Sequence, residues 1–188
     1  MIIGITGGMG CGKTYISNVL RKQGFPVYSC DDRARRLMVD DADIKAGLIE
    51  LVGENAFTDK GELNKPVIAE FLYANKENQE KINALVHPKV KADFQMWSKL
   101  QDADVIFMEC AILYESGFDQ LVDKVLYVYA SDDVRIHRII HRDKLNRMEV
   151  TRRVKTQIPE AVKMRLADFC IINNGNNNIL KQLQSIQI

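Results

Sequence analysis

The sequence has few of the features that mark membrane, nucleic-acid-binding or disulfide-rich proteins. No apolar run approaches the roughly 20 residues that cross a bilayer, and the 188 residues carry a formal net charge of only +1. The cysteines show no C-x-x-C spacing, which argues against a zinc site or a disulfide framework. We therefore expect a soluble, cytoplasmic protein with free thiols that uses neither membrane nor nucleic acid as a partner. The sequence indicates no particular protein partner.

A glycine-rich stretch near the start matches G-x-x-x-x-G-K-[ST], with Gly7, Gly12, Lys13 and Thr14 at the fixed positions. An apolar, β-branched run precedes it and a helical spacing of apolar residues follows, which is the context that turns backbone amides toward phosphate. We expect Lys13 to reach the β and γ phosphates of ATP and Thr14 to bind Mg²⁺. An ordinary glycine-rich turn is the alternative. The loop residues expected at ATP are Gly8, Gly10, Cys11, Gly12, Lys13 and Thr14.

Five short apolar runs without strict alternation are typical of parallel strands covered on both faces. Helical patterns separate these runs, so the sequence predicts an α/β fold with a doubly wound, five-stranded parallel sheet. The predicted strands are Ile2–Thr6, Phe25–Cys30, Val105–Glu109, Val125–Ala130 and Phe169–Ile172.

Two insertions interrupt this order, leaving residues 1–30, 101–142 and 167–188 as the core. Residues 31–100 contain no convincing strand and form a helical insertion, in which Pro88 is placed to begin a helix. Residues 143–166 are basic, with few large apolar side chains, and form a mobile flap. Most of the flap charges are expected to form a solvated face: Lys144, Arg147, Arg152, Arg153, Lys155, Lys163 and Arg165. The helical segments expected in the first insertion are Ile44–Val52, Lys65–Tyr73, Gln79–Val86 and Pro88–Leu100.

Polar side chains follow the carboxyl ends of the predicted strands, where ligands of open parallel sheets bind. Asp31 follows the second strand and is a candidate base for an attacking hydroxyl, with a helix N-cap as the alternative. Glu109 ends the third strand and is a candidate Mg²⁺ residue, directly or through water, with capping or salt bridging as the alternative. The asparagine tract 173–178 is expected to form a turn and the N-cap of a final helix.

Three arginines lie on the predicted helix that leads to the flap: Arg135, Arg138 and Arg142. The spacing places Arg138 and Arg142 on one helix face, and guanidinium groups bind phosphate oxygens bidentately. We expect Arg142 to contact phosphate when the flap closes, with a solvated basic face as the alternative.

Cys11 lies inside the glycine-rich loop and next to a helix N-terminus. Both the loop amides and the helix dipole favour a thiolate, so Cys11 is expected to react with alkylating reagents and to be protected by Mg-ATP. Small apolar filling is the alternative role of this cysteine.

These elements together resemble the dephospho-CoA kinase family of P-loop kinases over nearly the whole chain. The phosphate loop is common to many kinases, whereas the His-Pro, Leu-x-Glu and Asn-Asn-Gly elements in this order are far more specific. The resemblance is carried by Thr6–Thr14, Asp31 with Ala34-Arg35, Asn83–Pro88, Ile112–Gly117, Arg138 with Arg142-Asp143, and Ala167-Asp168-Phe169 with Asn173-Asn174-Gly175.

The resemblance implies a nucleotide-binding core, a helical CoA-binding part at 31–100 and a lid at 143–166. It also implies ATP as phosphate donor, Mg²⁺, and dephospho-CoA as the acceptor. Asp31 corresponds to the second aspartate of the family's D-x-D element, the base for the ribose 3′-hydroxyl. Arg35 and His87 become contributors to the substrate pocket, although chemistry alone favours a structural histidine. Residues implied at ATP beyond the loop are Arg138, Arg142 and Asn174.

Two positions depart from the family pattern. Ser29 stands where the family usually has the first aspartate of D-x-D, so no role for that carboxylate carries over. Ala111 replaces the usual proline before Ile112-Leu113.

Other functions are compatible with the phosphate loop alone. A different small-molecule P-loop kinase is the nearest alternative, and a nucleotide-binding domain without catalysis is another. A GTP-dependent switch is disfavoured because the sequence has no N-K-x-D motif and no Asp-x-x-Gly after the third strand.

Overall fold

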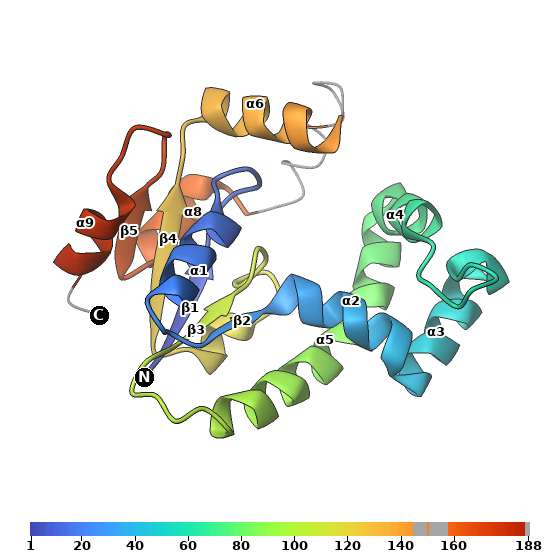
Figure 1. Ribbon diagram of the computed structural model, residues 1–188. Coiled ribbons are helices and arrows are strands. Elements are labelled where there is room, and N and C mark those ends of the chain that lie inside the picture. Colours follow the sequence, from blue (N-terminus) through green and yellow to red (C-terminus); the bar gives the residue numbers. More distant parts are fainter. Residues whose placement is uncertain (145–149, 151–157, 187–188) are drawn as a thin grey trace. The chain divides into compact units, whose positions relative to one another are not determined.

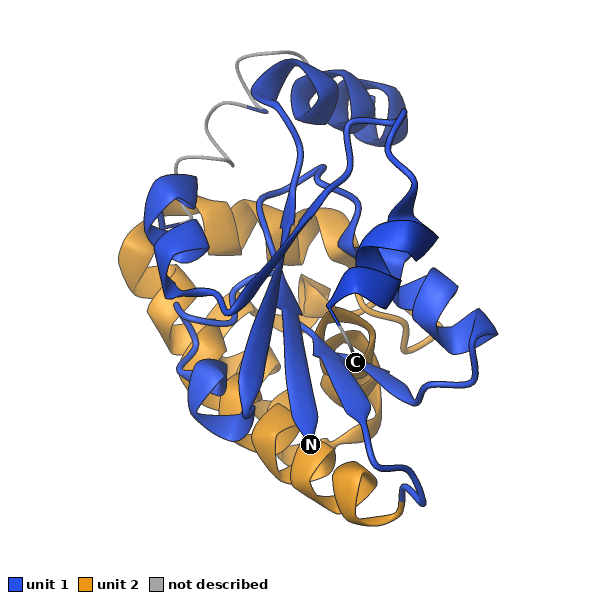
Figure 2. Cartoon of the chain, turned by 90° about the vertical axis from the view of Figure 1, so that its left-hand side faces the viewer, with its two compact units in different colours: residues 1–29, 101–188 blue, residues 30–100 orange. Residues whose placement is uncertain are grey.

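The structure is a computed structural model that describes residues 1–144, 150 and 158–186. It contains two compact units: unit 1 comprises Met1–Ser29 with Gln101–Ile188, and unit 2 comprises Cys30–Leu100 (Figure 2). Part of the predicted lid lies outside the described residues, including Arg147, Arg152, Arg153 and Lys155. The functional roles of core, insertion and lid remain predictions.

Unit 1 is built on a parallel sheet with the strand order β2-β3-β1-β4-β5 (Figure 1). The chain starts in the centre at β1, moves to β2 and β3 on one side, and then crosses to β4 and β5 on the other. This is the doubly wound arrangement and confirms the predicted fold class. The strands are β1 Ile2–Thr6, β2 Val27–Ser29, β3 Ile106–Glu109, β4 Lys124–Tyr129 and β5 Phe169–Ile172.

Successive residues of the central strand β1 face opposite sides of the sheet. Ile3 and Ile5 enter a buried core that includes residues of α1 (Lys13–Lys22) and α9 (Ile179–Ser185). Gly4 faces the other side, where a Cβ atom would lie 3.0 Å from a methyl carbon of Leu113. The sheet is therefore covered on both faces, as its lack of strict alternation predicted.

The remaining helices of unit 1 connect or follow its strands. Asn178 caps α9 by accepting a hydrogen bond from the Lys181 amide at 3.0 Å, which confirms the predicted N-cap. The other described helices of unit 1 are the 3₁₀ turn η2 Phe118–Leu121, α6 Asp132–Asp143 and α8 Glu160–Leu166.

Unit 2 is helical, as predicted, and all of its residues are described. Its only β pairing there is an isolated antiparallel bridge between Phe57 and Leu63. Helix α2 packs against α3 and α5, and α4 packs against α5. The elements are α2 Cys30–Asp40, α3 Ala42–Val52, η1 Glu54–Ala56, α4 Lys65–Ala74 and α5 Lys76–Lys99.

Helix α5 runs without interruption through Pro88, so the prediction that Pro88 begins a helix is wrong. A proline removes one backbone donor, but the apolar stripe continues across it at helical spacing. Ile82, Val86, Val90 and Phe94 are all buried along this stripe. Packing within unit 2 therefore outweighs the local break signal.

No described helix has the combination of length and apolarity needed to cross a bilayer.

Candidate active site

The glycine-rich loop connects β1 to α1 at the carboxyl edge of the sheet. Parallel pairing aligns Ile5 of β1 with Glu109 of β3, so β3 ends level with the start of the loop. Gly10 and Gly12 have φ angles of 80° and 96°, which side chains rarely allow. Glycine is therefore required by the path of the backbone as it enters α1.

Lys13 is the first residue of α1, and its side chain is buried against the loop. Its Nζ donates hydrogen bonds to the carbonyl oxygens of Gly7 at 2.9 Å and Gly8 at 3.2 Å. A lysine ammonium is a compact charge on a flexible stem, so it can transfer such bonds to phosphate oxygens. The cation needed to compensate phosphate charge is therefore already at the loop.

Thr14 and Glu109 come together from α1 and β3. The Thr14 Oγ1 donates a hydrogen bond to the Glu109 Oε1 at 2.8 Å, and Glu109 is buried. A hydroxyl and a carboxylate are hard oxygen ligands of the kind that Mg²⁺ prefers. This donor set fits the predicted metal role, which remains a prediction. No cluster of three or more His, Cys, Asp or Glu side chains suited to a metal occurs among the described residues.

Side chains from α6 and from the end of β5 bind the carbonyl groups of the loop. Arg138 Nη1 donates to the carbonyls of Gly10 at 3.4 Å and Cys11 at 3.3 Å. Asn173 Nδ2 donates to the Cys11 carbonyl at 2.8 Å and lies so close to Gly12 that a Cβ atom there would clash. These bonds fix the carbonyl groups of Gly10 and Cys11 and so restrain the peptide groups whose amides are expected to bind phosphate.

Asn173 was missed by the sequence analysis, which selected its neighbour Asn174. The Asn174 Oδ1 accepts a hydrogen bond from the Ser131 amide at 2.8 Å, joining the loops that follow β5 and β4. The asparagine tract signalled the right loop, but only the fold shows which amide contacts the glycines. An ATP contact of Asn174 remains a prediction.

Arg142 lies at the end of α6, where its guanidinium forms a two-point ion pair with the neighbouring Asp143 at 2.7 and 2.9 Å. Its side chain is 67% exposed, and the bond to Asp143 raises the pKa of Arg142. Arg138 donates hydrogen bonds to loop carbonyls, whereas the guanidinium of Arg142 donates to Asp143. A phosphate contact of Arg142 remains a prediction.

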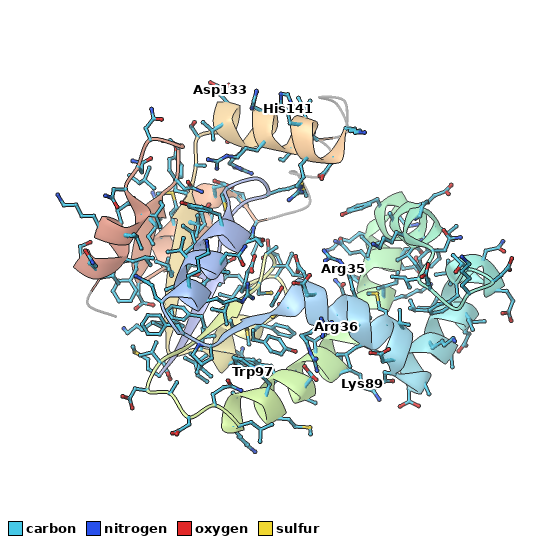
Figure 3. The ribbon with its side chains drawn as sticks, in the orientation of Figure 1. Arg35, Arg36, Lys89, Trp97, Asp133 and His141 are labelled. Atoms are coloured by element: carbon cyan, nitrogen blue, oxygen red, sulfur yellow. The ribbon has the colours of Figure 1, made fainter. Side chains whose placement is uncertain are left out.

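The predicted substrate residues all lie in unit 2. Asp31 is in the first turn of α2, which begins at Cys30, so the alternative that Asp31 is the N-cap is wrong. Arg35, also on α2, donates to Asp32 at 2.8 Å at the surface (Figure 3). His87 is partly buried on α5, and burial lowers the pKa of His87, which favours the neutral imidazole. An ion pair between Arg33 and Asp93 links α2 to α5.

Two side chains that the sequence analysis placed near solvent are buried. Cys11 is fully buried within the loop, which agrees with its alternative role as small apolar filling, and of the four thiols Cys170 alone is exposed. The reaction of Cys11 with alkylating reagents remains a prediction. Lys163 is only 1% exposed, because its Nζ pairs with Glu115 at 2.7 Å instead of facing solvent. The compact loop and α8 create this burial, which residue type alone does not reveal.

Comparison with known proteins decides the family. A profile of the dephospho-CoA kinase family matches residues 1–178. The chain belongs to the dephospho-CoA kinase family. A dephospho-CoA kinase of Bacteroides fragilis is 38% identical over 182 residues, covering 96% of this chain and 88% of the relative. A dephospho-CoA kinase of Fusobacterium nucleatum is 34% identical, covering 94% of this chain and 91% of the relative.

Solved structures share the fold of this chain. A crystal structure of a Thermus thermophilus protein is similar with a TM-score of 0.86 at 29% identity, covering 100% of this chain and 96% of that one. A shikimate kinase from Acinetobacter baumannii, at 17% identity and a TM-score of 0.55 over 99% and 90% of the two chains, shares the fold alone. As a member of the dephospho-CoA kinase family, the chain is an ATP-dependent kinase of coenzyme A biosynthesis.

Proposed function

We propose that the chain transfers the γ phosphate of ATP to the ribose 3′-hydroxyl of dephospho-CoA, using the glycine-rich loop of unit 1 as its phosphate site. The observation that carries the site assignment is the 2.8 Å bond between Thr14 and Glu109, beside the loop that holds Lys13. It joins the two candidate metal residues from separate elements. Family membership supports dephospho-CoA as the acceptor.

The loop residues supply positive electrostatic potential to the phosphates. Amides of Gly8, Gly10, Cys11, Gly12 and Thr14 are the proposed donors at the amino end of α1. The Lys13 ammonium exchanges its bonds to loop carbonyls for oxygens of the β and γ phosphates. Arg138, Arg142 and Asn174 are proposed to complete the ATP site.

Thr14 and Glu109 are the residues proposed to hold Mg²⁺, Glu109 directly or through water. When bound, the ion neutralises negative charge on the phosphates. The Thr14 hydroxyl keeps its proton directed at Glu109 while its lone pairs remain available, so this hydrogen bond is compatible with metal ligation.

Asp31 is the proposed base, and Arg35 and His87 are the proposed substrate residues. The Asp31 carboxylate accepts the proton of the 3′-hydroxyl while the hydroxyl oxygen bonds to the γ phosphorus and the bond to the ADP oxygen breaks. Arg35 carries a positive charge suited to the anionic acceptor. The neutral imidazole of His87 favours a hydrogen-bonding role over ion pairing.

The proposal is tested by ADP release from Mg-ATP with dephospho-CoA, a nucleoside and shikimate as separate acceptors. We expect release that depends on dephospho-CoA, and a product with a new phosphomonoester at the 3′ position by phosphorus NMR. Faster release with another acceptor, or release that is independent of any acceptor, would contradict the proposed reaction.

A further inference from the structure

Every carbonyl group from Gly7 to Cys11 accepts a hydrogen bond. Lys13 binds the carbonyls of Gly7 and Gly8, and side chains of α6 and the β5 end bind the others. The Met9 carbonyl is the one bound by Arg135, whose Nε donates to it at 2.9 Å. Arg135 therefore fixes the peptide group in the middle of the loop, a role that the sequence analysis did not assign.

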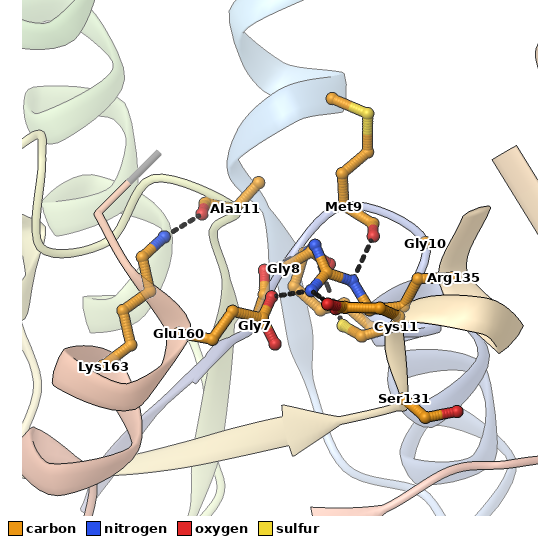
Figure 4. A network of polar contacts seen from close by, with 12 residues as sticks. Gly7, Gly8, Met9, Gly10, Cys11, Ala111, Ser131, Arg135, Glu160 and Lys163 are labelled. Atoms are coloured by element: carbon orange, nitrogen blue, oxygen red, sulfur yellow. Dashed lines mark hydrogen bonds and ion pairs between the residues drawn. The ribbon is translucent and has the colours of Figure 1, made fainter. Parts of the chain in front are cut away.

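Arg135 is 3% exposed, and its guanidinium is neutralised by carboxylates within the same unit. Its Nη1 lies 2.5 Å from the Oε1 of Glu160, the first residue of α8, and 3.2 Å from Asp132. Figure 4 shows Arg135 between Met9 and Glu160. Because Asp132 is largely exposed and Glu160 is not, Glu160 is the main buried counter-charge.

This ion pair packs directly on the main chain of Gly8. A Cβ atom at Gly8 would lie 1.6 Å from the Glu160 Oε1 and 2.5 Å from an Arg135 nitrogen. Glu160 also raises the pKa of the buried Tyr127, after the larger effect of burial, which agrees with a carboxylate in a poorly solvated position. The absence of a side chain at Gly8 is therefore what lets the pair reach the loop.

We propose that Arg135 is a positioning residue of the phosphate loop and that Glu160 is the counter-charge that holds it in place. The pair acts through the Gly8 and Met9 peptides and so sets the affinity for the phosphates of ATP, without touching the acceptor. This inference rests on the proposed function of the loop.

The same helix offers a matched control. Lys163 of α8 forms a second buried ion pair, with Glu115 at 2.7 Å, and donates to the Ala111 carbonyl at 3.5 Å, away from the loop carbonyls (Figure 4). Loss of one partner from either pair leaves an uncompensated buried charge and lowers stability. Only the Arg135 pair is expected to change ATP binding.

The test measures ATP affinity by calorimetry, KM for both substrates, and melting temperature. Two variants change the Arg135 pair: the single variant Arg135→Lys, and a double variant that combines Arg135→Gln with Glu160→Gln. The control variant is Lys163→Met. Lysine keeps the charge of Arg135 but loses the planar guanidinium, which donates to the Met9 carbonyl and pairs with Glu160 at the same time. The double variant removes both charges. We expect both to weaken ATP binding roughly tenfold, as for loss of a hydrogen bond to a charged group, with the KM for dephospho-CoA unchanged.

Lys163→Met is expected to lower the melting temperature while leaving ATP affinity unchanged. Wild-type ATP affinity in folded Arg135→Lys and in the double variant would overturn the inference. So would a loss of ATP affinity in Lys163→Met that matches theirs, because that would indicate a purely structural effect. Failure of the proposed function is distinguishable: the wild type would then bind ATP without phosphorylating dephospho-CoA.

Discussion

The two units hold their charged side chains differently. In unit 1, Lys13, Glu109, Arg135 and Lys163 are buried and bonded to fixed partners. In unit 2, which is described throughout, no charged side chain is buried, and both members of the Arg35–Asp32 pair are more than half exposed. A buried, bonded group is pre-organised, whereas an exposed one adjusts to its ligand. The proposed phosphate site is thus held by buried contacts, whereas Arg35 of the proposed acceptor site is exposed.

The comparison predicts that changes in unit 1 affect ATP and that changes in unit 2 affect the acceptor step. Lys13→Ala is expected to have the largest effect, lowering transfer by about a hundred- to a thousandfold or more, as for loss of one main electrostatic group. The measurement is dephospho-CoA-dependent ADP release, with the melting temperature to check the fold. Lys22→Ala, an exposed change at the other end of α1, is the control. Normal turnover of Lys13→Ala would contradict the phosphate-loop assignment.

Asp31→Asn is expected to reduce turnover by about a hundred- to ten-thousandfold, the range for loss of a general base, while ATP affinity stays constant. The measurements are the turnover number and ATP binding by calorimetry. Asp40→Asn makes the same chemical change at an exposed position of α2 and is expected to be neutral. Unimpaired turnover of Asp31→Asn would contradict the role of Asp31 as the base. Asp31 would then have only a structural role, as an acidic residue in the first turn of α2.

Arg138 and Arg142 sharpen the comparison within unit 1. Arg138→Ala removes bonds to two loop carbonyls, so it is expected to weaken ATP binding and transfer together, by roughly tenfold. Arg142→Ala is expected to slow transfer more than it weakens ATP binding, as for a residue that binds charge developing in the transition state. Steady-state kinetics with ATP calorimetry separates the two effects. Unchanged kinetics of Arg142→Ala would contradict a phosphate contact and would favour the alternative that Arg142 is a solvated surface residue.

Asp168 gives the smallest expected effect, on stability alone. The bond from Lys124, and then the Val125 amide, lower the pKa of Asp168 below its ordinary value of 3.8. The folded pKa is depressed, so the stabilisation is fully present above the unfolded pKa and is lost as the pH falls through the folded pKa. Asp168→Asn should cost about 1 kcal/mol at neutral pH, and the difference should begin to close below about pH 4 and vanish below the folded pKa. A difference in denaturant midpoint that persists at low pH would contradict this account.

Much of the fold was predictable because its signals are local. The strand runs, the glycine loop and the Asn178 cap each depend on neighbouring residues, and the structure confirms them. The sequence could predict that Thr14 and Glu109 lie at the same edge of the sheet, but not that they are in contact, since the two residues lie 95 positions apart.

Buried charges were not predictable in the same way. Arg135 and Lys163 look like solvent-facing basic residues until Glu160 and Glu115 are placed beside them by the fold. Pro88 shows the reverse error, because a local break signal is outweighed by the buried stripe of α5. These cases depend on which charges pair and which residues pack together in the folded chain. The pattern of neighbouring residues does not specify these long-range contacts.

The most direct test of the phosphate and metal site is ATP binding by calorimetry at a series of Mg²⁺ concentrations, for the wild type and for Glu109→Gln. Glutamine preserves the shape of Glu109 and can still accept the Thr14 bond, but it removes the negative charge. The account predicts that the variant needs a roughly tenfold higher Mg²⁺ concentration for half-maximal ATP affinity, with ATP binding in excess EDTA unchanged. Superimposable Mg²⁺ dependence in the two proteins would contradict the assignment of Glu109 and Thr14 to the metal.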